Sequence, residues 1–222
     1  MKILVTGGAG FIGSNFINYW LRNHPEDHLV NIDKLTYASD PANINANLIN
    51  DNYSFVRGDI CDMKLVDQLV KDSDSVINFA AESHVDNSIQ SPEPFIMSNY
   101  FGTFSLLEAV RKYDARFHHV STDEVYGSLS LESADSFNEN SKYAPRNPYS
   151  ASKAASDLLV KAYVNTYNVR ATISNCGNNF GPNQHPEKLI PKTILSALSG
   201  KTIPVYGDGK QVRDWVFAGS VF

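Results

Sequence analysis

Gly7-Gly8-Ala9-Gly10-Phe11-Ile12-Gly13 lies between a short apolar run at 2–6 and a segment whose apolar residues have helical spacing. The glycines at 8, 10 and 13 match the pattern G-x-G-x-x-G. Such glycines allow a tight turn, let a pyrophosphate approach the backbone and pack a helix closely against a sheet. The free N–H groups at the start of that helix attract phosphate. The stretch therefore predicts a dinucleotide site between a first strand and a first helix.

Strand-like and helix-like segments alternate along the rest of the chain. Strands are expected at 2–6, 28–33, 53–57, 75–79, 116–122, 169–174 and 212–217. Helices are expected from residue 11 and at 62–71, 95–113, 149–167 and 188–199. This alternation predicts an α/β fold with a doubly wound parallel sheet of the Rossmann type. Ligands of such sheets bind at the carboxyl ends of the strands, which places the expected site at 7–13, 33–37, 59–60, 80–86, 121–126 and 174–182.

The composition narrows the class of protein further. The chain has 222 residues, of which 42% are hydrophobic, and this is enough for one large domain. The net charge is −5 and no block of basic residues stands out, so nucleic acid is not an expected partner. No apolar run reaches the length of a membrane span. The two cysteines, Cys61 and Cys176, suggest neither a disulfide framework nor a metal site, and a reducing cytoplasm is the expected location.

Asp33 ends the second expected strand, 20 residues after Gly13. An acidic residue at this spacing hydrogen-bonds the ribose hydroxyls of a dinucleotide, and its charge repels the additional phosphate of NADP. The sequence therefore predicts NAD rather than NADP as the cofactor.

Tyr149-Ser150-Ala151-Ser152-Lys153 places a phenol and an ammonium four residues apart, on one face of a helix. A neighbouring ammonium favours the phenolate, so Lys153 is expected to lower the pKa of Tyr149 and make it a general base. Thr122, at the end of an expected strand, is placed to hydrogen-bond the same substrate oxygen.

Two adjacent carboxylates, Asp123 and Glu124, follow Thr122 directly. Like charges held together raise one pKa, so one group can act as an acid while the other acts as a base. Oxidation at a single carbon needs only the Thr122, Tyr149 and Lys153 set. The additional pair therefore indicates a further proton-transfer step, such as the elimination of water.

Together these motifs resemble the extended short-chain dehydrogenase/reductase superfamily, in its NAD-dependent epimerase/dehydratase branch that acts on nucleotide sugars. Within the branch the chain is similar to the nucleotide-sugar 4,6-dehydratases. The resemblance rests on the motifs above and on the stretches 33–38, 80–86, 178–182, 186–191 and 212–215. Sugar 4-epimerases of the branch lack the Asp-Glu pair, and GDP-mannose dehydratases carry Ser before the Glu. The resemblance thus implies dTDP-glucose as the nucleotide-sugar substrate.

The resemblance also implies a hydro-lyase mechanism. Tyr149 takes the proton of the sugar 4-hydroxyl while NAD⁺ accepts hydride from C4, and Thr122 helps to position that oxygen. Glu124 then removes the C5 proton, Asp123 protonates the departing C6 hydroxyl, and hydride returns to C6. The expected product is dTDP-4-keto-6-deoxyglucose.

Site residues follow from the fingerprint and from matching positions. The catalytic residues are Thr122, Asp123, Glu124, Tyr149 and Lys153. The expected cofactor contacts are Gly7, Gly10, Phe11, Ile12, Gly13, Asp33, Lys34, Thr36, Asp59, Ile60, Ala80, Ala81, Ser98, Tyr149, Lys153 and Asn179. The expected substrate contacts are Ser83, Thr122, Asn178, Lys188, Leu189, Pro204, Tyr206 and Arg213. No metal ligands are expected.

Several features leave alternatives open. Asn87, Gly177 and Phe180 depart from the residues usual in the family. Residues 1–175 are expected to form the NAD-binding domain with the catalytic groups, and 176–222 the beginning of a nucleotide-sugar-binding portion that is truncated, with most of its lobe absent. A homodimer through a four-helix interface of 95–113 and 149–167 is implied by resemblance. The rival hypotheses are another epimerase or dehydratase of this branch and a non-catalytic NAD-binding remnant.

Overall fold

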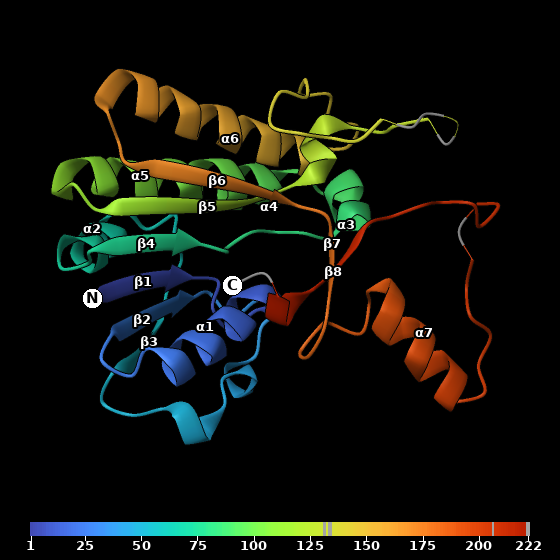
Figure 1. The fold of residues 1–222 in the computed structure, drawn as a ribbon, viewed down its shortest axis with the longest axis horizontal. Coiled ribbons are helices and arrows are strands. Elements are labelled where there is room, and N and C mark those ends of the chain that lie inside the picture. The colour runs from blue at the N-terminus through green and yellow to red at the C-terminus, as the bar shows by residue number, and fades with distance from the viewer. Residues whose placement is uncertain (131, 133–134, 206, 221–222) are drawn as a thin grey trace.

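The computed structural model describes residues 1–130, 132, 135–205 and 207–220. Its centre is a six-stranded parallel sheet in the order β3-β2-β1-β4-β5-β6 (Figure 1). The strands are β1 (Lys2–Thr6), β2 (His28–Asp33), β3 (Tyr53–Arg57), β4 (Ser75–Asn78), β5 (Arg116–Thr122) and β6 (Ala171–Cys176). The predicted doubly wound sheet is confirmed. The strand order reverses between β1 and β4, so a crevice opens at their carboxyl ends.

Alternate residues of the strands supply the two halves of the core. Leu4 of β1 and Phe117 of β5 belong to the larger half, which packs against α2 (Met63–Lys71), α5 (Gly102–Tyr113) and α6 (Pro148–Tyr167). Ile3 and Val5 point to the opposite face and pack in one cluster with residues of α1 (Phe11–Asn23), with Ile44 and with Leu48. Ile44 follows the short 3-10 helix Pro41–Asn43, and Leu48 ends a second one, Ala46–Leu48. This alternation follows from the two-residue period of a strand.

The helix expected at 95–113 is not uniform. Helix α4 (Glu93–Phe95) leads into a π-helix at Ile96–Phe101, and α5 continues from Gly102. A π-turn holds one more residue than an α-turn, and such turns are frequent at functional sites. Helical spacing of apolar residues does not reveal it, and the short helix α3 (Val85–Gln90) before it was also missed.

Beyond β6 the chain leaves the main sheet. β7 (Asn178–Phe180) pairs in parallel with β8 (Trp215–Phe217), and α7 (Leu189–Leu198) lies out to one side of the sheet (Figure 1). None of the α7 residues is buried. The strand expected at 212–217 is shorter than predicted and covers only Trp215–Phe217. The strand expected at 169–174 begins and ends two residues later. β7 was missed because its residues belong to a stretch with the composition of a Gly/Asn-rich loop.

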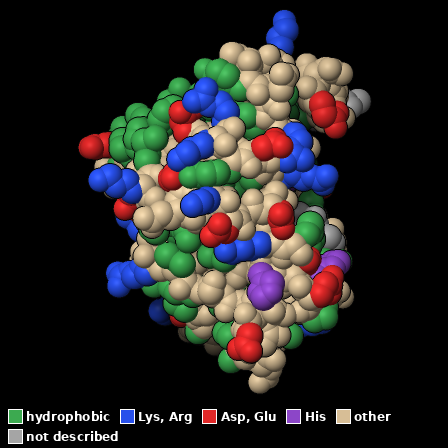
Figure 2. All heavy atoms as spheres, turned by 90° about the vertical axis from the view of Figure 1, so that its left-hand side faces the viewer, with side chains coloured by type: hydrophobic (Ala, Val, Ile, Leu, Met, Phe, Trp, Pro, Cys, Tyr) green, Lys and Arg blue, Asp and Glu red, His purple; other side chains and the backbone are tan. Residues whose placement is uncertain are grey.

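The face at the amino ends of the strands carries no concentration of one charge. Basic and acidic side chains are interspersed there (Figure 2). None of the helices within the described ranges is both long and apolar enough to cross a membrane.

Candidate active site

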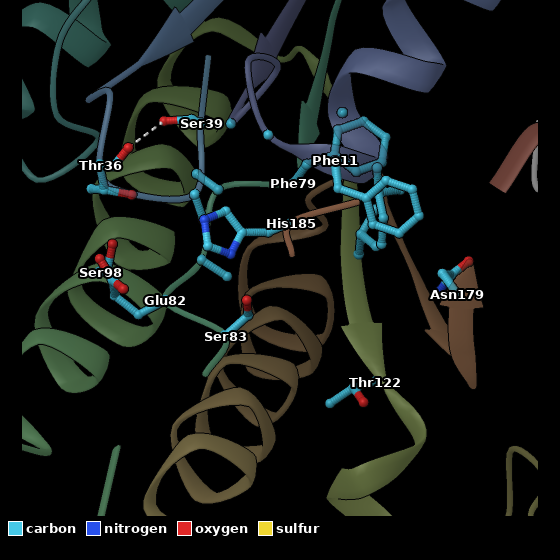
Figure 3. A pocket seen from close by; sticks show the side chains of 18 of the residues that line it. Phe11, Thr36, Ser39, Phe79, Glu82, Ser83, Ser98, Thr122, Asn179 and His185 are labelled. Atoms are coloured by element: carbon cyan, nitrogen blue, oxygen red, sulfur yellow. Dashed lines mark hydrogen bonds between the residues drawn. The ribbon is translucent and has the colours of Figure 1, made fainter. Parts of the chain in front are cut away.

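A cleft of about 320 Å³ opens at the carboxyl ends of β1, β2, β4, β5 and β6. Figure 3 shows how Phe11 at the start of α1, Glu82 and Ser83 after β4, and His185 from the C-terminal segment surround one space. The cleft is lined by every predicted cofactor contact: Gly7, Gly10, Phe11, Ile12, Gly13, Asp33, Lys34, Thr36, Asp59, Ile60, Ala80, Ala81, Ser98, Tyr149, Lys153 and Asn179. Residues that are far apart in the sequence are thus brought together as the strand-end rule predicts.

Neighbouring backbone atoms leave no room for a side chain at Gly7 and Gly13 of the glycine-rich loop. Gly7 has φ +69°, and a Cβ there would lie 2.6 Å from the backbone nitrogen of Ala80. A Cβ on Gly13 would lie 2.4 Å from the carbonyl oxygen of Gly7. Helix α1 begins at Phe11 with Gly10 as its N-cap and no side-chain cap, so its first N–H groups face the cleft without a side-chain partner. The loop is a cradle shaped for a group that approaches the backbone.

Asp33 is 7% exposed and its carboxylate braces the same loop. One oxygen accepts from the Ala9 N–H at 2.9 Å and the other from the Leu35 N–H at 2.8 Å. A carboxylate has about four acceptor positions, so both oxygens can still accept from a ligand. Next to it the Lys34 ammonium lies 2.7 Å from the Asp59 carboxylate and closes this end of the cleft with an ion pair.

Tyr149 and Lys153 lie one turn apart on α6, beside the end of β5. Tyr149 is partly buried, and its ring meets Phe95 edge-on at 6.4 Å. The prediction that Lys153 lowers the pKa of Tyr149 is wrong for this structure. Burial raises that pKa well above the ordinary value, the Glu124 charge adds to the rise, and a hydrogen bond from Thr122 opposes it.

Lys153 is engaged elsewhere, which explains this correction. Its ammonium donates to the Val120 carbonyl at 2.8 Å and lies 3.5 Å from Nε2 of His119. Burial lowers the pKa of Lys153 to about 8, against the opposing charge of Asp157. Asp157, fully buried, lies 3.5 Å from the same His119 nitrogen. A buried lysine, histidine and aspartate therefore stand behind Tyr149.

Asp123 and Glu124 form a short 3-10 turn (Asp123–Tyr126) that begins where β5 ends. Thr122 caps the turn, because its hydroxyl accepts from the Glu124 N–H at 3.3 Å. Burial raises the pKa of Asp123, while the Thr122 hydrogen bond and the Arg213 charge lower it. Thr122 and Glu124 line the cleft, and Asp123 lies beside it without lining it. The two carboxylates thus have different environments.

The predicted substrate contacts divide into two groups. Ser83, Thr122, Asn178 and Lys188 line the cleft, and the Lys188 ammonium donates to the Ser83 carbonyl at 3.3 Å. Leu189, Pro204 and Arg213 are exposed and do not line the cleft. The segment around α7, with Leu189 and Pro204, runs outward from the sheet (Figure 1). Arg213 instead lies just before β8, and its charge acts on Asp123 beside the cleft. Tyr206 lies outside the described residues.

Sequence reasoning missed several residues that build the site. Asn99, 1% exposed, pairs with the backbone of Glu82 through both its amide oxygen (2.9 Å) and its amide nitrogen (3.0 Å). The Asn99 amide also donates to Ser152 of α6 at 2.8 Å, so one side chain joins the β4 loop to the helix of Tyr149. Glu82, Gln184, His185 and Glu187 line the cleft as well. Within the sequence, only the position of Asn99 next to Ser98 could have indicated it.

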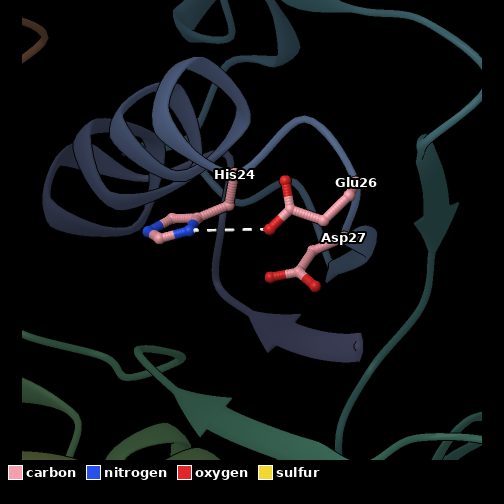
Figure 4. A group of neighbouring side chains, drawn as sticks. All are labelled: His24, Glu26 and Asp27. Atoms are coloured by element: carbon pink, nitrogen blue, oxygen red, sulfur yellow. Dashed lines mark ion pairs between the residues drawn. The ribbon is translucent and has the colours of Figure 1, made fainter.

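His24, Glu26 and Asp27 form the cluster that could offer metal-ligand atoms within the described ranges (Figure 4). The Asp27 carboxylate already accepts from the Trp20 indole at 3.1 Å and pairs with the N-terminal amine of Met1. His24 and Glu26 are 4.0 Å apart at the surface. These interactions give the cluster a structural role, because they fix the turn between α1 and β2 and tie it to the N-terminus.

The sheet order, the glycine-rich loop after β1 and the Tyr149/Lys153 pair on α6 define a Rossmann-type protein of the short-chain dehydrogenase/reductase superfamily. Residues 4–222 match the family model described as GDP-mannose 4,6 dehydratase. The chain belongs to this family.

Known proteins resemble the chain over nearly all of its length. The dTDP-glucose 4,6-dehydratase of Mycobacterium tuberculosis is 53% identical over 97% of the chain, and the chain spans 65% of that relative's length. A crystal structure of the Streptomyces venezuelae dTDP-glucose 4,6-dehydratase DesIV, with NAD and TYD bound, has TM-score 0.93 and 46% identity over 98% of this chain and 68% of its own. A UDP-glucuronic acid 4-epimerase from Bacillus cereus has TM-score 0.90 at 30% identity, covering 98% of this chain and 69% of its own. The fold is therefore shared with epimerases, and identity is higher to the dehydratases.

Proposed function

We propose that this chain belongs to an NAD-dependent hydro-lyase that converts dTDP-glucose into dTDP-4-keto-6-deoxyglucose. One observation carries the proposal: two carboxylates with different environments, Asp123 and Glu124, lie beside the Thr122, Tyr149 and Lys153 set at the end of β5. An oxidation alone leaves the carboxylates without a role. A water elimination needs an acid and a base. The greater identity to dTDP-glucose 4,6-dehydratases than to the epimerase supports the same choice.

The residues of the cleft fit NAD as the cofactor. Gly7 and Gly13 leave space for a pyrophosphate close to the backbone, next to the N–H groups that open α1. Asp33 would accept from the ribose hydroxyls and would repel a 2′-phosphate, which favours NAD over NADP. Asp59 and Ile60 would contact the adenine, and Asn179 the nicotinamide region. Bound NAD⁺ would supply a hydride acceptor for C4 and a hydride donor for C6.

Tyr149 is proposed as the base for the sugar 4-hydroxyl, with Thr122 positioning the same oxygen. Because burial raises the pKa of Tyr149, the phenol needs added positive charge nearby before it can release its proton near neutral pH. Lys153, mostly protonated at pH 7 with its pKa of about 8, would supply this charge only once its ammonium turns from the Val120 carbonyl towards the phenol. A positively charged cofactor ring would act in the same direction.

Glu124 and Asp123 divide the elimination between them. With C4 oxidised, the C5 proton becomes acidic and Glu124 is proposed to remove it. Asp123 is proposed to donate a proton to the C6 oxygen, which leaves as water. Burial raises the pKa of Asp123, and a raised pKa suits a carboxyl group that must hold a proton until it is needed.

The substrate is proposed to occupy the outer part of the cleft. Ser83 and Asn178 would contact the sugar, and the Lys188 ammonium would neutralise part of the diphosphate. Leu189, Pro204, Tyr206 and Arg213 remain proposed contacts of the nucleotide. In this division residues 1–175 bind the cofactor and carry the catalytic groups, and 176–222 begin the part that binds the nucleotide sugar.

The test is the product formed from dTDP-glucose by the purified chain with NAD⁺, identified by NMR. A 4-keto-6-deoxy sugar is the expected product, and a 4-epimer would identify an epimerase instead. Binding of NAD without binding of dTDP, measured by calorimetry, would favour the non-catalytic hypothesis.

The variant Glu124→Gln separates the two half-reactions. It should form reduced nicotinamide from dTDP-glucose while losing elimination by about 100-fold or more. Glu139→Gln, at an exposed loop position, is the matched control and should behave like the parent chain. Normal dehydration by Glu124→Gln would show that the base is assigned wrongly.

We further infer a homodimer and a cytoplasmic location. Apolar side chains are exposed on and before the helices that would form a four-helix interface: Ile89, Ile96, Met97, Tyr100 and Leu158. Cys61 and Cys176 are unpaired, which suits a reducing compartment. Sedimentation equilibrium of the chain and of Leu158→Glu tests the interface; a monomeric parent chain would reject it.

A further inference from the structure

Asn147 precedes α6, the helix that carries Tyr149 and Lys153, and its side chain is fixed at both ends. Its amide oxygen accepts from the Ser150 N–H at 2.8 Å, while the Ser150 hydroxyl lies 3.2 Å from the Asn147 N–H. This reciprocal arrangement is a capping box. Because the oxygen must face a backbone N–H, the amide nitrogen is the atom that points away from the helix.

That nitrogen meets a proposed catalytic group. Nδ2 of Asn147 donates to Oε2 of Glu124 at 3.3 Å. Glu124 belongs to the 3-10 turn after β5, and its own N–H is held by Thr122. The Glu124 carboxylate is therefore connected to the strand through its backbone and to α6 through its side chain.

The contact joins the two halves of the proposed reaction. Asn147 lies two residues before Tyr149 in the chain, and the cap fixes the first turn of the helix from which Tyr149 projects. The base for the 4-hydroxyl and the base for the C5 proton are thus positioned from one residue.

We propose that Asn147 is a positioning residue for the elimination step: its amide nitrogen holds the Glu124 carboxylate in one orientation while its amide oxygen caps α6. The inference rests on the proposed function. It goes beyond it by assigning a role to a residue that lies outside the lining of the cleft.

Two substitutions keep the cap and change only the contact with Glu124. In Asn147→Ser the hydroxyl still caps the helix, but the side chain is too short to reach Glu124 and offers no amide donor. In Asn147→Asp the cap and the length remain, and a carboxylate faces Glu124 in place of an N–H. Both variants should keep a Tm within about 2 °C of the parent, since Ser, Asp and Asn cap with similar strength.

The expected kinetic result is a selective loss. Formation of reduced nicotinamide should stay within about twofold, while product formation should fall about tenfold in Asn147→Ser, the equivalent of one charged hydrogen bond. Asn147→Asp should fall further, because its carboxylate repels the carboxylate of Glu124 and pushes it out of position. Equal loss of both half-reactions, or no loss of elimination, would overturn the proposal.

A control separates helix stability from positioning. Asn168→Ala lies at the other end of α6, where Asn168 has φ +55°, and it should destabilise the same helix without touching Glu124. It should leave the ratio of elimination to oxidation unchanged.

A measurement without cofactor or substrate keeps the inference separate from the proposed function. In crystal structures of the unliganded chain, the Glu124 carboxylate should keep one orientation in the parent and in Asn168→Ala and should lose it in Asn147→Ser and Asn147→Asp. An unchanged Glu124 orientation in both Asn147 variants would refute the positioning role even in an active enzyme. A displaced carboxylate in a chain that forms no 4-keto-6-deoxy product would refute the proposed function alone.

Discussion

Gly7→Ala is the substitution whose effect the structure defines most sharply. The residue has φ +69°, in the left-handed region that an L side chain adopts at a cost of about 1 to 2 kcal/mol. A Cβ would also lie 2.6 to 2.9 Å from three backbone atoms of Phe79 and Ala80. Those atoms belong to the chain leaving β4, so neither side of the contact can swing away.

Gly200 supplies a matched control because it shares the backbone conformation without the contact. Its φ is +62°, and a Cβ there would have nothing within 4 Å. Gly200→Ala should therefore show only the conformational cost, about 1.5 kcal/mol or a fall in Tm of about 3 to 6 °C for a chain of this length. Forcing a methyl into packed backbone adds about 2 kcal/mol. Gly7→Ala should then lose about 3.5 kcal/mol, a fall in Tm of about 7 to 14 °C.

Thermal unfolding of the two variants and calorimetric titration with NAD measure both consequences. Gly7→Ala should bind NAD at least tenfold more weakly because the loop must move away from β4, whereas Gly200→Ala should bind like the parent. Equal falls in Tm for the two variants would show that the close approach of the loop to β4 contributes nothing. Unchanged NAD affinity in Gly7→Ala would show that this loop does not cradle the cofactor.

Three further predictions concern the buried polar groups of the site. In Lys153→Met the stability gained over the parent chain should shrink by about 1 to 3 kcal/mol as the pH rises from about 8 towards 10.5. The reason is that burial lowers the pKa of Lys153 in the folded chain, so the parent carries the cost of a buried charge below about pH 8 and is relieved of it as the pH rises further. Chemical denaturation of both chains at several pH values measures this. A difference in unfolding free energy that does not change with pH would contradict the prediction. Asp33→Asn should weaken NAD binding at least tenfold, because the amide group has one acceptor oxygen for the N–H groups of Ala9 and Leu35. It should also reduce the preference for NAD over NADP, because the amide carries no charge to repel a 2′-phosphate. An unchanged ratio of the NAD and NADP affinities in calorimetry would refute the role of Asp33 in this preference. Asn99→Ala should cost about 2 to 4 kcal/mol in urea unfolding, since it removes a buried amide and leaves the part-buried backbone groups of Glu82 without that partner. A loss below about 1 kcal/mol would mean that water replaces the amide.

The parts of the fold that were predictable are those controlled by local pattern. The apolar run 2–6, the glycines that follow and Asp33 at the end of β2 have one consistent interpretation, and the strand-end rule then brings the predicted cofactor contacts into one cleft. The Asp62 cap of α2 was predictable for the same reason, and it accepts from the N–H groups of Lys64 and Leu65. Such features depend on neighbouring residues alone.

The parts that were not predictable depend on contacts between distant residues. The pKa of Tyr149 follows from how deeply the cleft buries it and from Glu124, 25 positions earlier, and not from the lysine on its own helix. Asn99 acquires its role from Glu82 and Ser152, which the fold brings to it. Leu189 and Pro204 were expected at the site from matching positions, yet they lie outside the cleft, on a segment whose helix α7 has no buried residue.

The π-helix at Ile96–Phe101 has a consequence for how this protein tolerates insertions and deletions. A π-turn is in effect an α-helix with one residue inserted, and it lets two consecutive residues serve different neighbours: Ser98 lines the cleft while Asn99 turns towards Glu82 and α6. Deleting any single residue between 96 and 101 would let the segment close into a regular helix. The residues before the deletion would then rotate by about 100° relative to α5, which is one residue's share of a 3.6-residue turn. A one-codon deletion here removes no strand residue, yet it would break the link that Asn99 makes between the Glu82 backbone and Ser152 on the helix of Tyr149.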